Sequence, residues 1–272
     1  IDGISLEDLI KKRTYGLLKP EMAKKITETT RKEYPEGIPA FGTDALRFTY
    51  CALASTGRDI RFDLKRVEGY RNFCNKLWNA ARYVLMVTEN QLNGPSQVDT
   101  PSSLPLSHKW EKEKIEFSVI DRWIQSLFEK TLQTITEHFK NYRFDLLAQT
   151  LYEFIWNEFC DWYLELSKAI LNSSEVSETL KNGTRFTLLT ILEATLRLAH
   201  PIMPFITEAI WQRVAPLLNK DGKSIMLESY PAPHINTIDE EAIRQIDWLK
   251  GIASTVRNLR SEFNILPNKQ LH

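Results

Sequence analysis

Apolar residues recur every three or four positions along most of the chain, which is the spacing of one face of an α-helix. The pattern predicts a short helix after Ser5 and longer ones over residues 20–34, 44–55, 65–86, 118–142, 144–171, 184–199 and 205–218. A capping box of Thr237 and Glu240 opens a final helix that runs to Phe263. Residues 223–230 fit one short strand or a segment that is merely extended. We therefore predict an all-α protein, an antiparallel helix bundle with a small N-terminal helical segment.

The helix expected at residues 144–171 is rich in aromatic side chains, which lie on both of its sides. They are Tyr152, Phe154, Trp156, Phe159, Trp162 and Tyr163. Because one stripe cannot hold so many, we expect this helix at the centre of the bundle, with its aromatic residues in the core. Four acidic residues accompany them with no cation between, namely Glu153, Glu158, Asp161 and Glu165. Such a face repels a phosphate backbone, so we expect RNA to bind elsewhere.

The helix expected at residues 65–86 carries two different stripes. One is apolar and predicted to be buried: Val67, Tyr70, Cys74, Leu77, Trp78, Ala81 and Leu85. The other follows the same spacing and is mainly polar: Lys65, Asn72, Lys76, Asn79, Tyr83 and Met86, flanked by Arg66, Arg71, Asn75 and Arg82. Since amides read base edges and cations hold phosphates, the second stripe predicts an RNA-facing helix.

Positive charge gathers around this helix, although the whole chain is balanced with 35 basic and 35 acidic residues. Between residues 57 and 82 the cations outnumber the anions by four: Arg58, Arg61, Lys65, Arg66, Arg71, Lys76 and Arg82 against Asp59, Asp63 and Glu68. Tyr83, expected to point outward beside Arg82, offers an aromatic plane for an unpaired base. The same residue types also fit an ordinary solvated helix face, so they leave both interpretations open.

The length and composition of the chain limit its possible domain number and protein class. The 272 residues allow one large or two small domains, and an apolar fraction of 43% is ordinary for a soluble protein. The longest apolar-rich region, residues 186–211, contains charged residues and two prolines. We therefore expect no membrane span, no membrane partner and no signal peptide.

Residue types suited to catalysis or to metal binding do not cluster along the chain. Cys51, Cys74 and Cys160 are far apart and lie in apolar helical patterns, which indicates buried reduced thiols. Neither they nor the histidines show the short spacing of a zinc site, so we predict no metal. His200 stands at a helix end beside Pro201, where capping or a core hydrogen bond is the simpler role. We predict no catalytic residue.

Five segments, in the same order, closely resemble valyl-tRNA synthetases in the part that follows their catalytic core. They are residues 42–48, 57–60, 69–82, 158–164 and 200–205. The Asn-Lys-Leu-Trp-Asn run at residues 75–79 and the His-Pro-Ile-Met-Pro-Phe run at residues 200–205 are also similar to isoleucyl and leucyl enzymes. Each alone therefore indicates only the class I subgroup for aliphatic amino acids. The sequences at residues 69–74 and 159–165 favour valine.

The resemblance implies a fragment of such an enzyme, organised in three parts. The His-Ile-Gly-His and Lys-Met-Ser-Lys-Ser elements of the family's adenylate-forming chemistry do not occur in the chain. We therefore expect no activity and no cofactor in the chain itself, ATP with magnesium serving the full-length parent. The implied parts are a stem-contact and linker segment (1–62), an anticodon-binding bundle (63–230) and a C-terminal helix and extension leading toward an arm (231–272).

By this resemblance, the bundle recognises the anticodon and positions tRNA on an enzyme that charges it with valine. The candidate contacts are Lys65, Arg66, Arg71, Asn72, Asn75, Asn79, Arg82 and Tyr83. Lys65, Arg82 and Tyr83 match positions where the family's domain meets the anticodon loop, with Tyr83 as the stacking plane. The implied partners are tRNA for valine, through its anticodon loop and inner stem, and the catalytic core, in a cytoplasmic monomer. The alternatives are an isoleucyl or leucyl enzyme's domain, or a helical protein-interaction module without RNA binding.

Overall fold

A computed structural model describes residues 3–55, 62–89, 115–220, 222–234, 238–266 and 269. The first described helices are α1 (Leu6–Thr14), α2 (Met22–Glu33), α3 (Thr43–Leu53) and α4 (Leu64–Glu89). The next are α6 (Val119–Lys140), α7 (Phe144–Glu153), the π-helix η1 (Phe154–Tyr163), α8 (Leu164–Asn172) and α9 (Glu178–Ala199). The last are α10 (Pro204–Val214), the 3₁₀ turns η2 (Ala215–Leu218) and η3 (Ile225–Leu227), and α11 (Glu240–Glu262). The predicted all-α class is confirmed.

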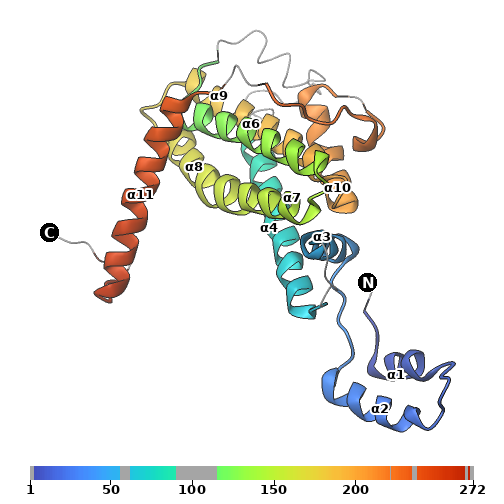
Figure 1. Ribbon diagram of the computed structural model, residues 1–272. Coiled ribbons are helices and arrows are strands. Elements are labelled where there is room, and N and C mark those ends of the chain that lie inside the picture. Colours follow the sequence, from blue (N-terminus) through green and yellow to red (C-terminus); the bar gives the residue numbers. More distant parts are fainter. Residues whose placement is uncertain are drawn as a thin grey trace, which may run out of the picture.

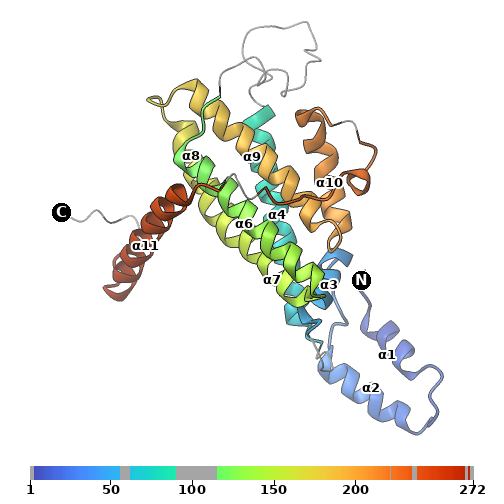
Figure 2. The ribbon, with the colours of Figure 1, turned by 45° about the horizontal axis from the view of Figure 1, so that its top comes forward.

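The bundle is formed by α4, α6, the continuous run from α7 to α8, and α9 (Figures 1 and 2). Short turns join α6 to α7 and α8 to α9, so these neighbours run antiparallel, as predicted. Helices α1 and α2 pair with each other away from the bundle, whereas α3 packs on α4, α7 and α10. Helix α11 packs its first turns on α6 and then projects from the bundle (Figure 1).

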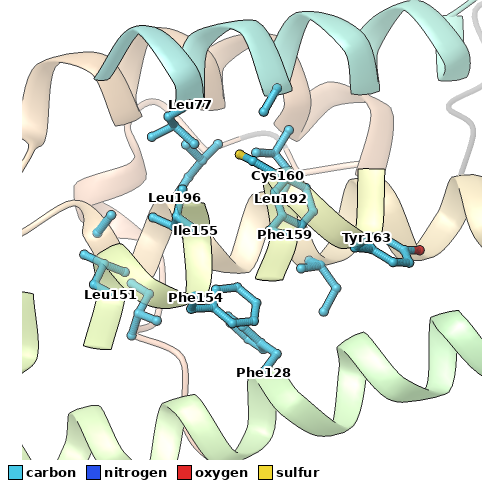
Figure 3. Packing of buried hydrophobic residues seen from close by; sticks show 14 of the residues in the cluster. Leu77, Phe128, Leu151, Phe154, Ile155, Phe159, Cys160, Tyr163, Leu192 and Leu196 are labelled. Atoms are coloured by element: carbon cyan, nitrogen blue, oxygen red, sulfur yellow. The ribbon is translucent and has the colours of Figure 1, made fainter. Parts of the chain in front are cut away.

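The helix run through η1 lies at the centre of the core, as its aromatic content predicts. Figure 3 shows Phe154 against Phe128 of α6, and Ile155 on the side of Leu77 from α4 and Leu196 from α9. Phe154, Phe159 and Tyr163 are buried, but Tyr152, Trp156 and Trp162 are only half-buried. These last three lie at the edge of the core because the neighbouring helices do not cover the whole circumference of the run.

Residues 154–163 form a π-helix where the pattern predicts an uninterrupted α-helix. The buried residues Leu151, Ile155, Cys160 and Leu164 follow one another at intervals of four or five, which is wider than the 3.6 residues of an α-helical turn. The wider turn keeps all four on the core side. Segments of this kind are rare, and they occur frequently at functional sites.

Two local predictions are wrong. Residues 223–230 contain no strand but the 3₁₀ turn η3, because Ser224 caps the amide of Met226 and the carboxylate of Glu208 accepts hydrogen bonds from Ser224 and the Ile225 amide. The final helix begins at Glu240, after Asp239, whose carboxylate accepts from the amides of Glu241 and Ala242. Thr237 lies outside the described residues, and aspartate is an equally strong N-cap.

Close packing leaves no room for a side chain at one glycine of α9. A Cβ added at Gly183 in α9 would stand 1.9 Å from the carbonyl oxygen of Glu116. We expect Gly183→Ala to lower the free energy of unfolding by about 1–3 kcal/mol, since overpacking outweighs alanine's helix preference. Gly251 in α11 faces open space, so Gly251→Ala is expected to raise stability by about 0.5–1 kcal/mol. Urea unfolding of both variants checks this, and stabilisation by both would contradict it.

Candidate nucleic-acid interface

Helix α4 packs against α3, α9, α10 and η1 and exposes one long face. Five of the predicted contacts share that face at helical spacing and are exposed: Lys65, Asn72, Asn75, Asn79 and Arg82. Arg66 is also exposed, on the side toward α7, while Arg71 and Tyr83 are half-buried. The structure therefore brings most of the predicted residues onto one surface, which we call the α4 face.

The polar groups of the α4 face are not engaged by other described residues. Within the described ranges, neither Lys65 nor Arg82 forms an ion pair, and the amides of Asn72, Asn75 and Asn79 form no side-chain hydrogen bond. The two cations stand about 25 Å apart along the helix, given a rise of 1.5 Å per residue. The face thus offers amide donors and acceptors between two cations. That arrangement suits base edges between backbone phosphates. The other cations of the predicted basic cluster, Arg58 and Arg61, lie outside the described residues.

Two of the predicted contacts have intramolecular partners. The guanidinium of Arg71 lies 5.6 Å from the ring centre of Phe41 and 3.4 Å from the carboxylate of Glu68. Arg71 thereby ties α4 to the segment that precedes α3. The ring of Tyr83 packs partly on the core, and the ammonium of Lys168 lies 5.4 Å from its centre. Tyr83 is therefore less open than its place in the polar stripe predicts, because α8 covers part of it.

The burial of α4 differs from the predicted apolar stripe at two positions. Trp78, expected inside, is 39% exposed and lies beside Arg82 and Arg213 in a small hollow between α4 and α10. Phe73, which the stripe omits, is fully buried against Phe48 and Tyr152. The buried arc is centred nearer Phe73 because α3 and η1 pack on that side. Trp78 therefore presents an aromatic ring at the surface, whereas the predicted apolar stripe places it in the core. Its position beside Arg82 follows from their four-residue spacing on the helix.

Three of the four acidic residues predicted to form an unpaired negative face have cationic partners, whereas Glu153 accepts a hydrogen bond from the amide of Gln149. Lys76 of α4 pairs with Asp161, and its ammonium lies 3.9 Å from the ring centre of Trp156. Lys250 of α11 pairs with Glu158 at 2.5 Å, and Lys168 pairs with Glu165 at 2.6 Å. The sequence does not indicate these pairs because two of the cations come from helices remote in sequence, and that RNA binds away from this face stays a prediction. Lys76, which is predicted in the polar stripe, therefore points toward η1.

His200 and the three cysteines lie at buried or half-buried positions. The Nδ1 of His200 lies 2.8 Å from the hydroxyl of Thr207, which confirms the hydrogen bond expected there, and burial lowers the pKa of this histidine. All three cysteines are free; Cys160 is buried and the others half-buried. Burial raises the pKa of Cys74 and Cys160 to about 12, so both thiols stay protonated.

The described residues carry neither a metal-binding cluster nor a membrane-spanning helix. No group of histidine, cysteine or acidic residues there is arranged to hold a metal ion. Likewise, none of the helices in the described ranges carries an apolar stretch long enough to cross a bilayer.

Comparison with known proteins points to one family. The model of the anticodon-binding domain of tRNA ligase matches residues 121–272. The valine–tRNA ligase of Acinetobacter baylyi is 52% identical over 265 residues, which are 97% of this chain and 26% of that protein. The valine–tRNA ligase of Coxiella burnetii is 52% identical over 271 residues, 100% of this chain and 28% of that protein, so the match includes α4. The chain spans about a quarter of the length of these curated relatives.

Proposed function

The chain belongs to the family of anticodon-binding domains of tRNA ligases, and from this premise we propose that its α4 face binds the anticodon loop of a tRNA. The observation that carries the proposal is the set of unengaged groups on that face, three asparagine amides between Lys65 and Arg82. An anticodon loop presents unpaired base edges framed by phosphates. Asparagine amides recognise base edges, and cations bind the phosphates.

The individual roles follow from exposure and partners. Lys65, Arg66 and Arg82 contact backbone phosphates, and Asn72, Asn75 and Asn79 read base edges. Tyr83 provides a stacking plane on the part of its ring that the core and Lys168 leave open, and Trp78 beside Arg82 provides a second one. Arg71 contributes less, since its guanidinium is held between Glu68 and Phe41.

We further propose that the parent protein is a valine–tRNA ligase, which charges tRNA with valine using ATP and magnesium. The identity of 52% to two such ligases supports valine over isoleucine or leucine. In this account the chain positions tRNA for valine through the anticodon loop and inner stem, while a catalytic core elsewhere in the parent makes the ester bond. The parent is a cytoplasmic monomer. The division into residues 1–62, 63–230 and 231–272 stays a prediction.

The salt dependence of tRNA binding tests the role of Arg82. If Arg82 contacts one phosphate, Arg82→Ala should flatten the slope of log K against log salt by about 0.7–1, because one counterion fewer is released. The measurement is a titration of tRNA at several salt concentrations. Arg244→Ala is the control, since Arg244 lies on α11 and pairs with Glu241.

Two results of this titration would count against the proposal. An unchanged slope in Arg82→Ala would exclude a phosphate contact at that residue. Weak binding that does not respond to salt, in the unaltered chain, would favour a helical protein-interaction module instead.

A further inference from the structure

A cavity of about 640 Å³ opens beside the α4 face. It lies between α4, α3, α7 and the start of η1, and Arg66, Gly69 and Tyr70 form its α4 wall. Gln149 and Tyr152 of α7 and Asn157 of η1 face them. Its volume falls in the range of pockets that hold small organic ligands, and neither the family match nor the relatives' names assign it a ligand.

The walls of the cavity are partly aromatic. Tyr70 and Tyr152 are both half-buried, with ring centres 6.2 Å apart in an edge-to-face arrangement. Behind them Tyr152 stacks on Trp156 at 5.5 Å and contacts Phe73 at 4.9 Å, so its ring is held in place. Gly69 lies in this wall, and a Cβ added there would meet no atom within 4 Å. The glycine thus leaves open space above the helix backbone at this wall of the cavity.

Several polar groups of the cavity have no partner among the described residues. The guanidinium of Arg66, the hydroxyls of Tyr70 and Tyr152 and the amide of Asn157 form no side-chain hydrogen bond or ion pair there. Two carboxylates complete the lining. Arg143 holds the pKa of Asp145 at about 2, so this carboxylate is ionised, and Glu153 accepts a hydrogen bond from Gln149 at 2.9 Å. The cavity therefore offers hydrogen-bond donors and acceptors to a ligand that carries N–H groups. Arg66 supplies one cation at the edge of the cavity.

We propose that this cavity receives one nucleotide of the bound RNA, its base inserted between α4 and α7 and its phosphate held by Arg66. The inference rests on the proposed function, because it assumes that RNA lies along the α4 face. A planar heterocycle fits beside fixed aromatic rings, and stacking of this kind tolerates any base. The carboxylate of Glu153 favours a base with an exocyclic amino group over uracil, since an amino group donates to a carboxylate oxygen. Asp145 contributes less, because both of its carboxylate oxygens accept from the guanidinium of Arg143.

Filling the cavity tests the proposal without removing any wall residue. Gly69→Leu places a side chain in the free space, and Gly251→Leu makes the same change in α11, where a Cβ also meets nothing within 4 Å. We expect Gly69→Leu to bind tRNA about tenfold more weakly, the loss of one stacked base, while Gly251→Leu binds as the unaltered chain does. Equal unfolding free energies of the two variants would show that the loss is not a folding defect. Asn157→Ala, which leaves the cavity open, should weaken binding in the same direction.

The outcomes separate this inference from the proposed function. If the unaltered chain fails to bind tRNA, the proposed function fails and the inference falls with it. If it binds and Gly69→Leu binds equally well, only the inference is overturned. Titration with free AMP and CMP distinguishes the source of the nucleotide. Binding of these that Gly69→Leu abolishes, with tRNA affinity unchanged, would assign the cavity to a free nucleotide and overturn the proposal.

Discussion

Replacing Glu193 by glutamine is expected to lower the free energy of unfolding by about 3 kcal/mol, because it removes a buried anion from two cations whose side chains are only 17% and 29% exposed. Glu193 in α9 is 2% exposed. Its carboxylate accepts from Arg197 at 2.9 Å, from Lys220 at 2.7 Å and from the indole of Trp211 at 3.0 Å. The cluster joins α9 to α10 and to the residues after η2. Urea unfolding near neutral pH measures the effect.

The matched control for this variant is Glu228→Gln. Glu228 lies 3.7 Å from the same Lys220, and its side chain is 25% exposed. We expect that change to cost about 1 kcal/mol or less, as for partly solvated ion pairs. A cost below 1 kcal/mol for Glu193→Gln, or equal costs for both variants, would contradict the account.

The effect of Glu193→Gln should also depend on pH. Burial alone raises the pKa of Glu193, but hydrogen bonds from Arg197 and Lys220 outweigh it and hold the pKa below the ordinary value of 4.5. A lowered carboxyl pKa stabilises the fold above the unfolded-state value, and that stability is lost as pH falls through the folded-state value. The difference between the unaltered chain and the glutamine variant should therefore narrow below about pH 4.5. A constant difference across that range would speak against a charged role.

The second large effect is expected from Asp121→Ala. Asp121 is fully buried at the start of α6, where it accepts from the Tyr163 hydroxyl at 2.7 Å, the Thr184 hydroxyl at 2.9 Å and the Ser118 hydroxyl at 2.6 Å. Alanine removes the capping box and leaves the hydroxyls of Tyr163 and Thr184 in the core without their acceptor. Since each buried group left unpaired costs about 1–3 kcal/mol, we expect a total loss of about 3 kcal/mol or more.

Tyr163→Phe separates the network from the packing around it. It removes one hydrogen bond while keeping the ring, so its expected cost is about 1 kcal/mol. Denaturant unfolding of both variants gives the comparison. If Asp121→Ala costs no more than Tyr163→Phe, the carboxylate does not organise α6, η1 and α9 as described.

Helical spacing predicts most of the fold because the apolar residues that recur every three or four positions are mostly the buried ones. The periodic range 118–142 agrees with α6, which begins after its N-cap Ser118, and the aromatic residues of η1 identify the central helix. The π-helical turns do not follow from the pattern, because they depend on how α4, α6 and α9 close around residues 154–163. The turn η3 is missed for a similar reason, since Glu208 holds Ser224 from another helix.

The candidate site was predictable in part. The predicted polar stripe with its flanks contains Asn72, Asn75, Asn79 and Arg82, which the structure exposes on one face, but also Lys76 and Tyr83, which are half-buried. The pattern of a single helix does not reveal which residues of other helices will contact it. Lys250 neutralises Glu158 across 92 residues of chain, and the cavity beside Gly69 is assembled from four separate elements. No spacing rule within α4 contains that information, because these contacts depend on the tertiary arrangement.

Anticodon discrimination tests the central claim most directly. The measurement compares the affinity of the chain for tRNA with a valine anticodon and for the same tRNA with its anticodon exchanged, in the unaltered chain, Arg82→Ala and Asn79→Ala. The account predicts tighter binding of the valine anticodon. Asn79→Ala should reduce that preference through a lost base contact worth about 1–3 kcal/mol, whereas Arg82→Ala should weaken the binding of both tRNAs about equally, as the loss of a phosphate contact does. Equal affinity for the two tRNAs in the unaltered chain would contradict the claim that the α4 face reads the anticodon.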